Sequence, residues 1–204
     1  MTRRAAAVFA ALALCASIAP AQETVDVRGR IALALTELDL GSIGPIAVYL
    51  EPLDPKMPLP PQPPELIRQR DAQFLPAFSI ATVGAEVQLL NDDDIFHNVF
   101  SFSGANAFDL GLYPRGESRT VRLQHPGEVH IYCSIHESMS GLILVVPTPY
   151  HTQAGPDGAF RIRGVLPGRY RLRTWNASLP PLARELEVGR GAAAPLELTL
   201  GRPE

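Results

Sequence analysis

Residues 132–141 read YCSIHESMSG and place Cys133, His136 and Met139 within seven residues. Two residues separate each of these side chains from the next, so one short loop can direct all three toward a single point. A thiolate, an imidazole nitrogen and a thioether suit copper, and a trigonal copper site of this kind uses two histidines, one cysteine and a distant axial methionine. The second histidine must therefore come from elsewhere in the chain.

Residues 91–101, NDDDIFHNVFS, offer His97 as that histidine. It lies 36 positions before Cys133, and a β-sandwich brings such distant positions together. The preceding carboxylates, Asp92, Asp93 and Asp94, are consecutive and lack the spaced oxygen ligands that calcium requires. We expect them to form a solvated turn.

Short β-type runs separated by Gly, Pro, Asn and Asp dominate the rest of the chain, which is 46% hydrophobic. No long stretch has the 3.6-residue period of an amphipathic helix, and the spacing of the runs predicts an all-β sandwich or barrel. The proline-rich residues 54–71 are predicted to be a linker. The end of this stretch, PPELIRQRDAQF, is compatible with one helical turn.

Residues 72–147 resemble the cupredoxins, the plastocyanin and amicyanin family of blue copper proteins. The resemblance rests on NDDDIFHNVFS and on GEVHIYCSIHESMSGLILV at residues 127–145. It implies a Greek-key β-sandwich in which His97, Cys133 and His136 are equatorial ligands and Met139 is the axial ligand. It also implies that Asn98 braces the loop that carries the cysteine, as outer hydrogen bonds do at metal sites.

One residue departs from the family pattern. Many relatives with a short loop have Pro directly after the loop histidine, whereas Glu137 follows His136 here. A carboxylate at this place could alter copper access, redox potential or partner choice. The alternative is an oxygen ligand, as in the less usual red copper sites.

Residues 155–175, GPDGAFRIRGVLPGRYRLRTW, resemble the carboxypeptidase regulatory-like or transthyretin-like β-sandwiches. We expect a discontinuous small sandwich of residues 23–53 with 148–201, into which residues 72–147 are inserted. The alternative is that the strands within residues 25–50 belong to the central unit. The whole arrangement also resembles proteins described as methylamine-utilisation-like.

Residues 1–21 have the pattern of a signal peptide: Arg3 and Arg4, an apolar run, and the small-residue sequence Ala19-Pro20-Ala21. A lipoprotein signal using Cys15 is the alternative, although Leu14 is bulky for it. The pattern predicts a periplasmic or secreted protein without a transmembrane segment after processing.

Loss of this segment leaves Cys133 as the one remaining cysteine, so an internal disulfide is excluded and a protected or ligated thiol is favoured. It also removes two positive charges, and the formal net charge falls from −3 to −5. A mildly acidic chain without a basic run is a poor match for nucleic acid or an anionic membrane surface.

Other candidate residues are expected to be structural. Strand alternation turns His130 and Tyr132 away from the face of Cys133, and His125 and His151 are expected at the surface. Four aromatic residues are expected in the core around the site: Phe96, Phe100, Phe102 and Phe108.

These features predict an exported mononuclear copper protein that carries single electrons to transient redox partners through the edge of His136. The chain has no G-x-S-x-G, no H-E-x-x-H and no glycine-rich phosphate loop, so we expect it not to be an enzyme. A copper-binding or copper-delivery module without redox turnover is the alternative. A thiol- or copper-dependent enzyme, with Cys133 and His136 as a nucleophile pair, is a weaker third.

Overall fold

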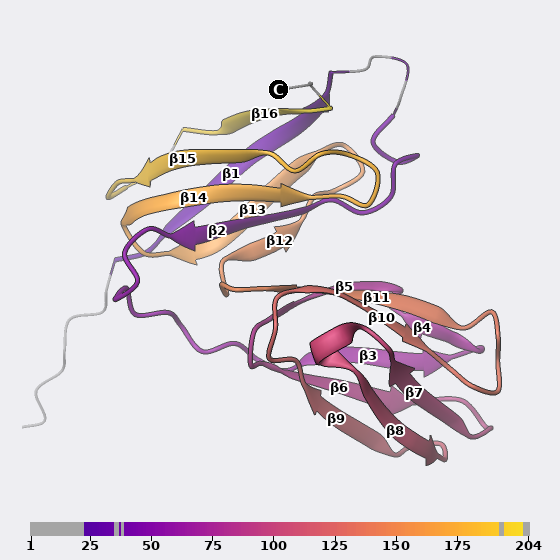
Figure 1. Ribbon diagram of the computed structural model, residues 1–204. Coiled ribbons are helices and arrows are strands. Elements are labelled where there is room, and N and C mark those ends of the chain that lie inside the picture. Colours follow the sequence, from indigo (N-terminus) through magenta and orange to yellow (C-terminus); the bar gives the residue numbers. More distant parts are fainter. Residues whose placement is uncertain (1–22, 35–36, 38, 192–193, 202–204) are drawn as a thin grey trace, which may run out of the picture.

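The structure is a computed structural model that describes residues 23–34, 37, 39–191 and 194–201. The predicted signal peptide, residues 1–21, lies outside this range. Figure 1 shows two layered β bodies, one built from both ends of the described chain and one from its middle. No helix among the described residues has the length and apolar character needed to span a membrane.

The prediction of an all-β fold is confirmed. The described residues form sixteen strands and one short 3-10 helix, η1 (Gly104–Asn106), and the strands make four sheets. The strands are β1 (Val25–Leu33), β2 (Ala47–Pro52), β3 (Glu65–Arg70), β4 (Gln73–Leu75), β5 (Phe78–Thr82), β6 (Glu86–Asn91), β7 (His97–Ser101), β8 (Phe108–Tyr113), β9 (Ser118–Arg122), β10 (Gly127–Tyr132), β11 (Ser140–Val146), β12 (His151–Gln153), β13 (Ala159–Val165), β14 (Gly168–Trp175), β15 (Ala183–Val188) and β16 (Leu196–Leu200).

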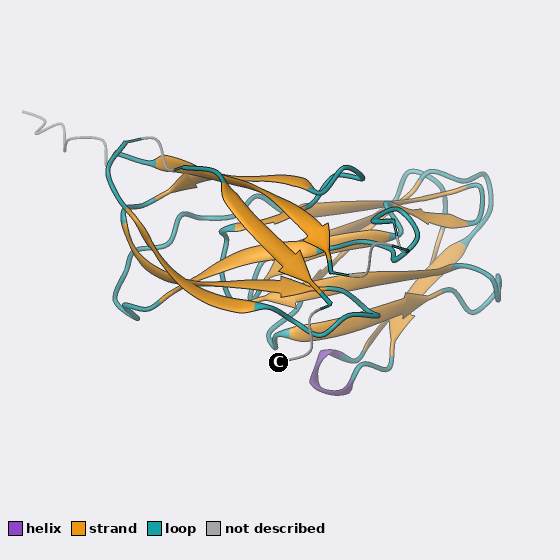
Figure 2. Ribbon diagram, turned by 90° about the horizontal axis from the view of Figure 1, so that it is seen from above, coloured by secondary structure: helices purple, strands orange, loops and turns teal. Residues whose placement is uncertain are grey.

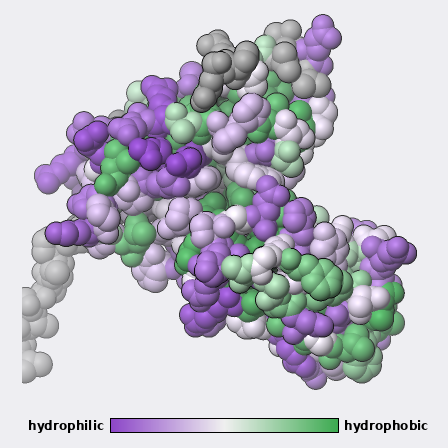
Figure 3. All heavy atoms as spheres, viewed as in Figure 1, coloured by the Kyte–Doolittle hydropathy of each residue, from purple (hydrophilic) through white to green (hydrophobic). Residues whose placement is uncertain are grey.

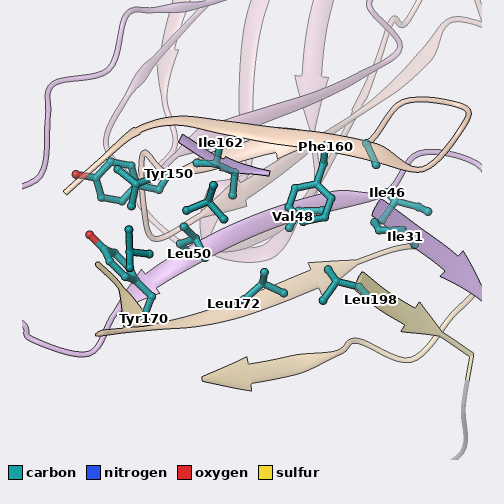
Figure 4. Packing of buried hydrophobic residues seen from close by; sticks show 14 of the residues in the cluster. Ile31, Ile46, Val48, Leu50, Tyr150, Phe160, Ile162, Tyr170, Leu172 and Leu198 are labelled. Carbon is teal, nitrogen blue, oxygen red and sulfur yellow. The ribbon is translucent and has the colours of Figure 1, made fainter. Parts of the chain in front are cut away.

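The terminal sandwich consists of the sheets β13-β1-β16 and β12-β2-β14-β15. Strand β2 pairs antiparallel with β14, so that Val48 lies opposite Thr174. Alternate residues of these strands point inward and form one apolar core, part of which is drawn in Figure 4. Its largest members include Ile31, Leu50, Tyr150, Phe160, Tyr170 and Leu172. Residues before and after the middle of the chain therefore share one core.

The central sandwich consists of the sheets β5-β11-β10-β7-β8 and β4-β3-β6-β9. Its core is separate from that of the terminal sandwich and contains Cys133 and Met139 together with Val99, Ile131 and Ile143. Figure 2 gives the same layers seen from above. Cys133 and Met139 therefore belong to a packed interior.

The helical turn expected near residue 65 is wrong, because these residues form β3. Strand β3 pairs parallel with β6 and antiparallel with β4, and it turns Ile67 and Gln69 into the core. Strands β4 and β5 separate β3 from its parallel partner β6 in the chain. The residue pattern around β3 alone therefore does not predict this pairing. The part of the expected linker that has no regular structure is residues 57–64.

The two sandwiches meet through a small apolar cluster of Ala47, Ile80, Leu144 and Val146, with Tyr49, Phe78 and Trp175 packed against it. Trp175 of β14 stacks on Phe78 of β5 with ring centroids 5.4 Å apart and an angle of 5° between the planes. Its indole N–H donates a hydrogen bond of 3.0 Å to Glu128 Oε1.

The contact between the sandwiches lies at one end of the large central sheet. In that sheet Glu128 pairs with Leu144 near the contact, whereas Tyr132 pairs with Ser140 at the other end, beside the Cys133 loop. The loop between β10 and β11 accordingly lies away from the terminal sandwich in Figure 1. The terminal sandwich leaves the candidate metal site uncovered.

The stack at this contact provides the first test. Phe78→Ala should shift the emission of Trp175, the one tryptophan of the chain, to longer wavelength, because the indole gains water. We also expect unfolding to become easier by about 1–3 kcal/mol, from lost packing and stacking. Phe102→Ala, at an aromatic residue that is 82% exposed, is the control and should leave the emission unchanged. Unchanged emission in Phe78→Ala would mean that the contact does not form in solution.

Candidate metal centre

The pairing of β7 with β10 brings His97 and Cys133 together. Phe100 of β7 pairs antiparallel with Tyr132 of β10. The start of β7 and the end of β10 therefore lie side by side at the same end of the strands. His97 is the first residue of β7, and Cys133 directly follows β10. Strand alternation turns His97 and Cys133 toward the core, where they are 0% and 4% exposed.

Three ligand atoms converge at this edge. Cys133 Sγ lies 3.6 Å from His97 Nδ1 and 3.9 Å from His136 Nδ1, and the two nitrogens are 3.2 Å apart. A point equidistant from the three atoms is about 2.1 Å from each, within the range of metal–imidazole bonds and close to the 2.3 Å of metal–thiolate bonds. The triangle formed by these atoms therefore fits a single ion. The ring planes of His97 and His136 are inclined at 56° to each other, so the rings do not stack.

Backbone hydrogen bonds close the loop between Cys133 and Met139. Met139 N–H donates to the His136 carbonyl at 2.9 Å, and Cys133 N–H donates to the Met139 carbonyl at 3.2 Å. Met139 is 1% exposed and packs in the same core cluster as Cys133. Its role as axial ligand stays a prediction.

Asn98 connects β7 to the cysteine loop. Its Oδ1 accepts hydrogen bonds from Ser134 N–H at 2.8 Å and from Ser134 Oγ at 2.9 Å. Since Asn98 follows His97 and Ser134 follows Cys133, the two bonds hold together the segments that carry two of the three ligand atoms. These bonds join the two segments, and the role of Asn98 as a brace at a metal site stays a prediction.

The expectation that Asp92, Asp93 and Asp94 form a solvated turn is wrong for the middle residue. The Asp93 side chain is 12% exposed, and Oδ2 lies 2.7 Å from His97 Nε2. Burial acts to raise the pKa of Asp93, but hydrogen bonds from Ala72 N–H, His97 and Asp71 N–H outweigh it and hold that pKa below its usual value.

Two more buried polar groups next to the site were missed in the sequence. Tyr113 pairs with His97 across β7 and β8, and its hydroxyl is hydrogen-bonded to the side chain of Gln69. Both residues are 0% exposed. Burial raises the pKa of Tyr113 to about 12, so this hydroxyl keeps its proton at neutral pH.

Glu137 is exposed and does not belong to the cluster formed by His97, Cys133 and His136 among the described residues. The outward orientation of His130 and Tyr132 is confirmed, since both are exposed while Val129 and Ile131 are buried. His151 differs from expectation. It is partly buried, and desolvation lowers its pKa to about 4.

The aromatic residues expected around the site are mostly not core residues. Phe96 and Phe102 are 55% and 82% exposed, and Phe100 and Phe108 are half-buried. Phe100 points to the outer face of its sheet, where its ring lies 5.1 Å from Phe102 and 5.8 Å from Tyr132. The aliphatic residues and Tyr113 fill the inner face instead, because this face lies under the second sheet.

Exposed apolar residues gather on the central sandwich. Of the large apolar residues that are exposed in the described chain, one, Leu59, lies outside it. The others are Leu66, Leu75, Ile95, Phe96, Phe102, Leu112, Tyr132 and Ile135. The visible face of the terminal sandwich is largely hydrophilic in Figure 3, while apolar residues cluster on the central one.

Fold and geometry together define a β-sandwich chain with a compact His–Cys–His cluster at one edge. Solved structures similar to part of it include a purple cupredoxin, amicyanin variants and a copper-containing nitrite reductase. A purple cupredoxin from Nitrosopumilus maritimus is 22% identical over 40% of this chain and 99% of its own, with a TM-score of 0.37. An oxidised amicyanin variant is 18% identical over 40% and 81%, with a TM-score of 0.38.

A copper-containing nitrite reductase from Thermus scotoductus SA-01 is 24% identical over 47% of this chain, with a TM-score of 0.40. This chain spans 25% of that enzyme's length. No protein-family model and no curated protein matches the sequence. The likeness is to the fold of one part of the chain.

The brace formed by Asn98 can be tested without any metal. Cys133 is buried. In the protein prepared without metal, the reaction of its thiol with a disulfide reagent should therefore be slow, because the fold must first open locally around the thiol. Asn98→Ala removes both bonds to Ser134 and should speed this reaction about tenfold or more. Asn176→Ala, at a buried asparagine of the terminal sandwich, is the control. Equal rates in Asn98→Ala and the wild type would exclude the brace.

Proposed function

We propose that this chain is an exported mononuclear copper protein that transfers single electrons. The triangle of Cys133 Sγ, His97 Nδ1 and His136 Nδ1 carries this proposal. One thiolate with two imidazoles is the equatorial set of copper electron-transfer sites, and Met139 would supply the weak axial thioether. Bound there, copper would supply the one-electron redox chemistry.

The chain's own contribution would be to hold the ligands in place. The three candidate ligand atoms lie at a spacing that fits one ion, and hydrogen bonds tie the loop that carries Cys133 and His136 to β7 and close it. A rigid ligand set limits reorganisation when the charge of the site changes, and this favours rapid electron transfer. Burial of Cys133 keeps its thiol away from oxidants and other thiols.

His136 is the ligand through which a partner would be reached. It is partly exposed, whereas His97 is buried. Ile135 precedes His136 in the chain and Phe96 precedes His97, and these apolar side chains are 50% and 55% exposed. A redox partner with a small apolar surface would fit this edge, in the short-lived contact typical of such encounters.

The two cores support a division into two domains. We propose that residues 72–147, extended at the start by β3, form the copper domain. The residues 23–53 and 148–201 would form a discontinuous second domain. Copper delivery without redox turnover is the competing function, and it predicts that Cu(I) leaves readily to a chelator.

Copper loading is the decisive experiment. The protein with Cu(II) should absorb visible light intensely through thiolate-to-copper charge transfer, and Cys133→Ser should abolish this band while His130→Ala, on the opposite face of β10, should keep it. Voltammetry should give a reversible couple. A colourless or zinc-selective protein would overturn the copper site. Reversible colour together with rapid loss of Cu(I) to a chelator would favour delivery over electron transfer.

A further inference from the structure

Asp93 is built into the candidate metal centre more firmly than its place in an Asp-rich turn suggests. Its carboxylate accepts hydrogen bonds from Asp71 N–H at 2.6 Å and Ala72 N–H at 3.0 Å, and its Oδ2 lies 2.7 Å from His97 Nε2. The first two belong to the turn between β3 and β4, and the third belongs to a candidate ligand. One side chain therefore links a distant turn to the metal site.

The contact with His97 decides which ring nitrogen carries the proton. An ionised carboxylate has only acceptor positions, so the nitrogen facing it, Nε2, must be the donor. In a neutral imidazole the other nitrogen, Nδ1, then has a free lone pair. Nδ1 is the atom that faces Cys133 Sγ and His136 Nδ1. The tautomer selected by Asp93 is the one that can bind a metal in the triangle.

The turn holds Asp93 in place in return. Asp71 and Ala72 have φ angles of 53° and 52°, a left-handed backbone that non-glycine residues seldom adopt. In this turn their N–H groups both point to the Asp93 carboxylate. Asn91, which is fully buried, accepts a hydrogen bond of 2.9 Å from Asp93 N–H. The orientation of the carboxylate is thus fixed from two sides.

The neighbouring carboxylates have different surroundings. Asp92 pairs with Arg68, whose side chain is 49% exposed, and the Asp94 side chain is 84% exposed and pairs with Arg115. Ion pairs whose side chains are this exposed to solvent contribute little to stability. The contact with His97 is therefore specific to Asp93 and is not shared by its neighbours.

We propose that Asp93, held by the Asp71–Ala72 turn, is a positioning residue that fixes His97 as the Nε2–H tautomer and aims Nδ1 into the metal site. The metal part of this inference rests on the proposed function. The tautomer part concerns the metal-free chain and stands independently. Carboxylate–histidine contacts of this kind fix ligand orientation at metal sites, and their loss lowers metal affinity about 10–100-fold.

The first measurement uses the metal-free full-length protein. Two-bond proton–nitrogen correlation spectra of the neutral imidazole should report His97 as the Nε2–H tautomer alone. Asp93→Asn keeps the size of the side chain but weakens the acceptor, and Asp93→Ala removes the acceptor. Both should introduce the Nδ1–H tautomer. Asp92→Asn and Asp94→Asn are the matched controls and should leave His97 unchanged.

The second measurement is copper affinity of the same five proteins by competition with a chelator. We expect a loss of about 10–100-fold in the Asp93 variants and less than twofold in the controls. An unchanged tautomer and unchanged affinity in both Asp93 variants would overturn the proposal. If Asp93→Ala does not fold, Asp93→Asn decides alone. If the wild type takes no copper yet the tautomer responds as expected, the proposed function fails and the positioning role stands.

Discussion

The candidate site depends on the short antiparallel contact between β7 and β10, where Phe100 pairs with Tyr132. This contact places the first residue of one strand and the residue after the other at the same edge, although 36 positions separate His97 from Cys133. Sheet geometry then turns both side chains inward. A shift of one residue in this register would exchange the faces and turn Cys133 toward solvent. The same pairing that builds the sheet therefore builds the site.

Burying these polar groups has an energetic cost, which hydrogen bonds must offset. Around the site His97 is bound to Asp93, Asn98 to Ser134, and Gln69 to Tyr113. Gln69 Oε1 is an exception at the site, since it has no hydrogen-bond partner among the described residues. These hydrogen bonds favour the observed arrangement, because rotating a bonded side chain would leave a buried donor or acceptor unpaired. The hydrogen bond to Asp93 therefore helps to orient the buried ring of His97.

The parts of the structure that follow from local pattern could be predicted from sequence. The spacing of Cys133 and His136, the alternation along β10 and the turn residues between strands are local, and the all-β fold and the closeness of these two side chains agree with them. His97 is distant in the chain, and the resemblance to a known family indicated it rather than local spacing. The failures concern partners that are distant in the chain. Strand β3 exists because β6 lies beside it, and the Asp93 side chain is only 12% exposed because it is hydrogen-bonded to the Asp71–Ala72 turn. Phe102 is exposed because the second sheet does not cover that face, and residue type alone carries no such information.

The terminal sandwich also affects what the central sandwich can do. The outer face of the large central sheet carries Ile80, Leu144 and Val146, which would meet water if the contact with Tyr49 and Trp175 were absent. An apolar sheet face left open promotes association between chains. The terminal sandwich covers this face at the Glu128 end and leaves the opposite edge, with His136, free. Because β10 and β11 run from the covered end to the ligand loop, the contact restrains the two strands that support Cys133 and Met139. The terminal sandwich placed in this way supports the strands beneath the candidate site and leaves the partly exposed His136 accessible.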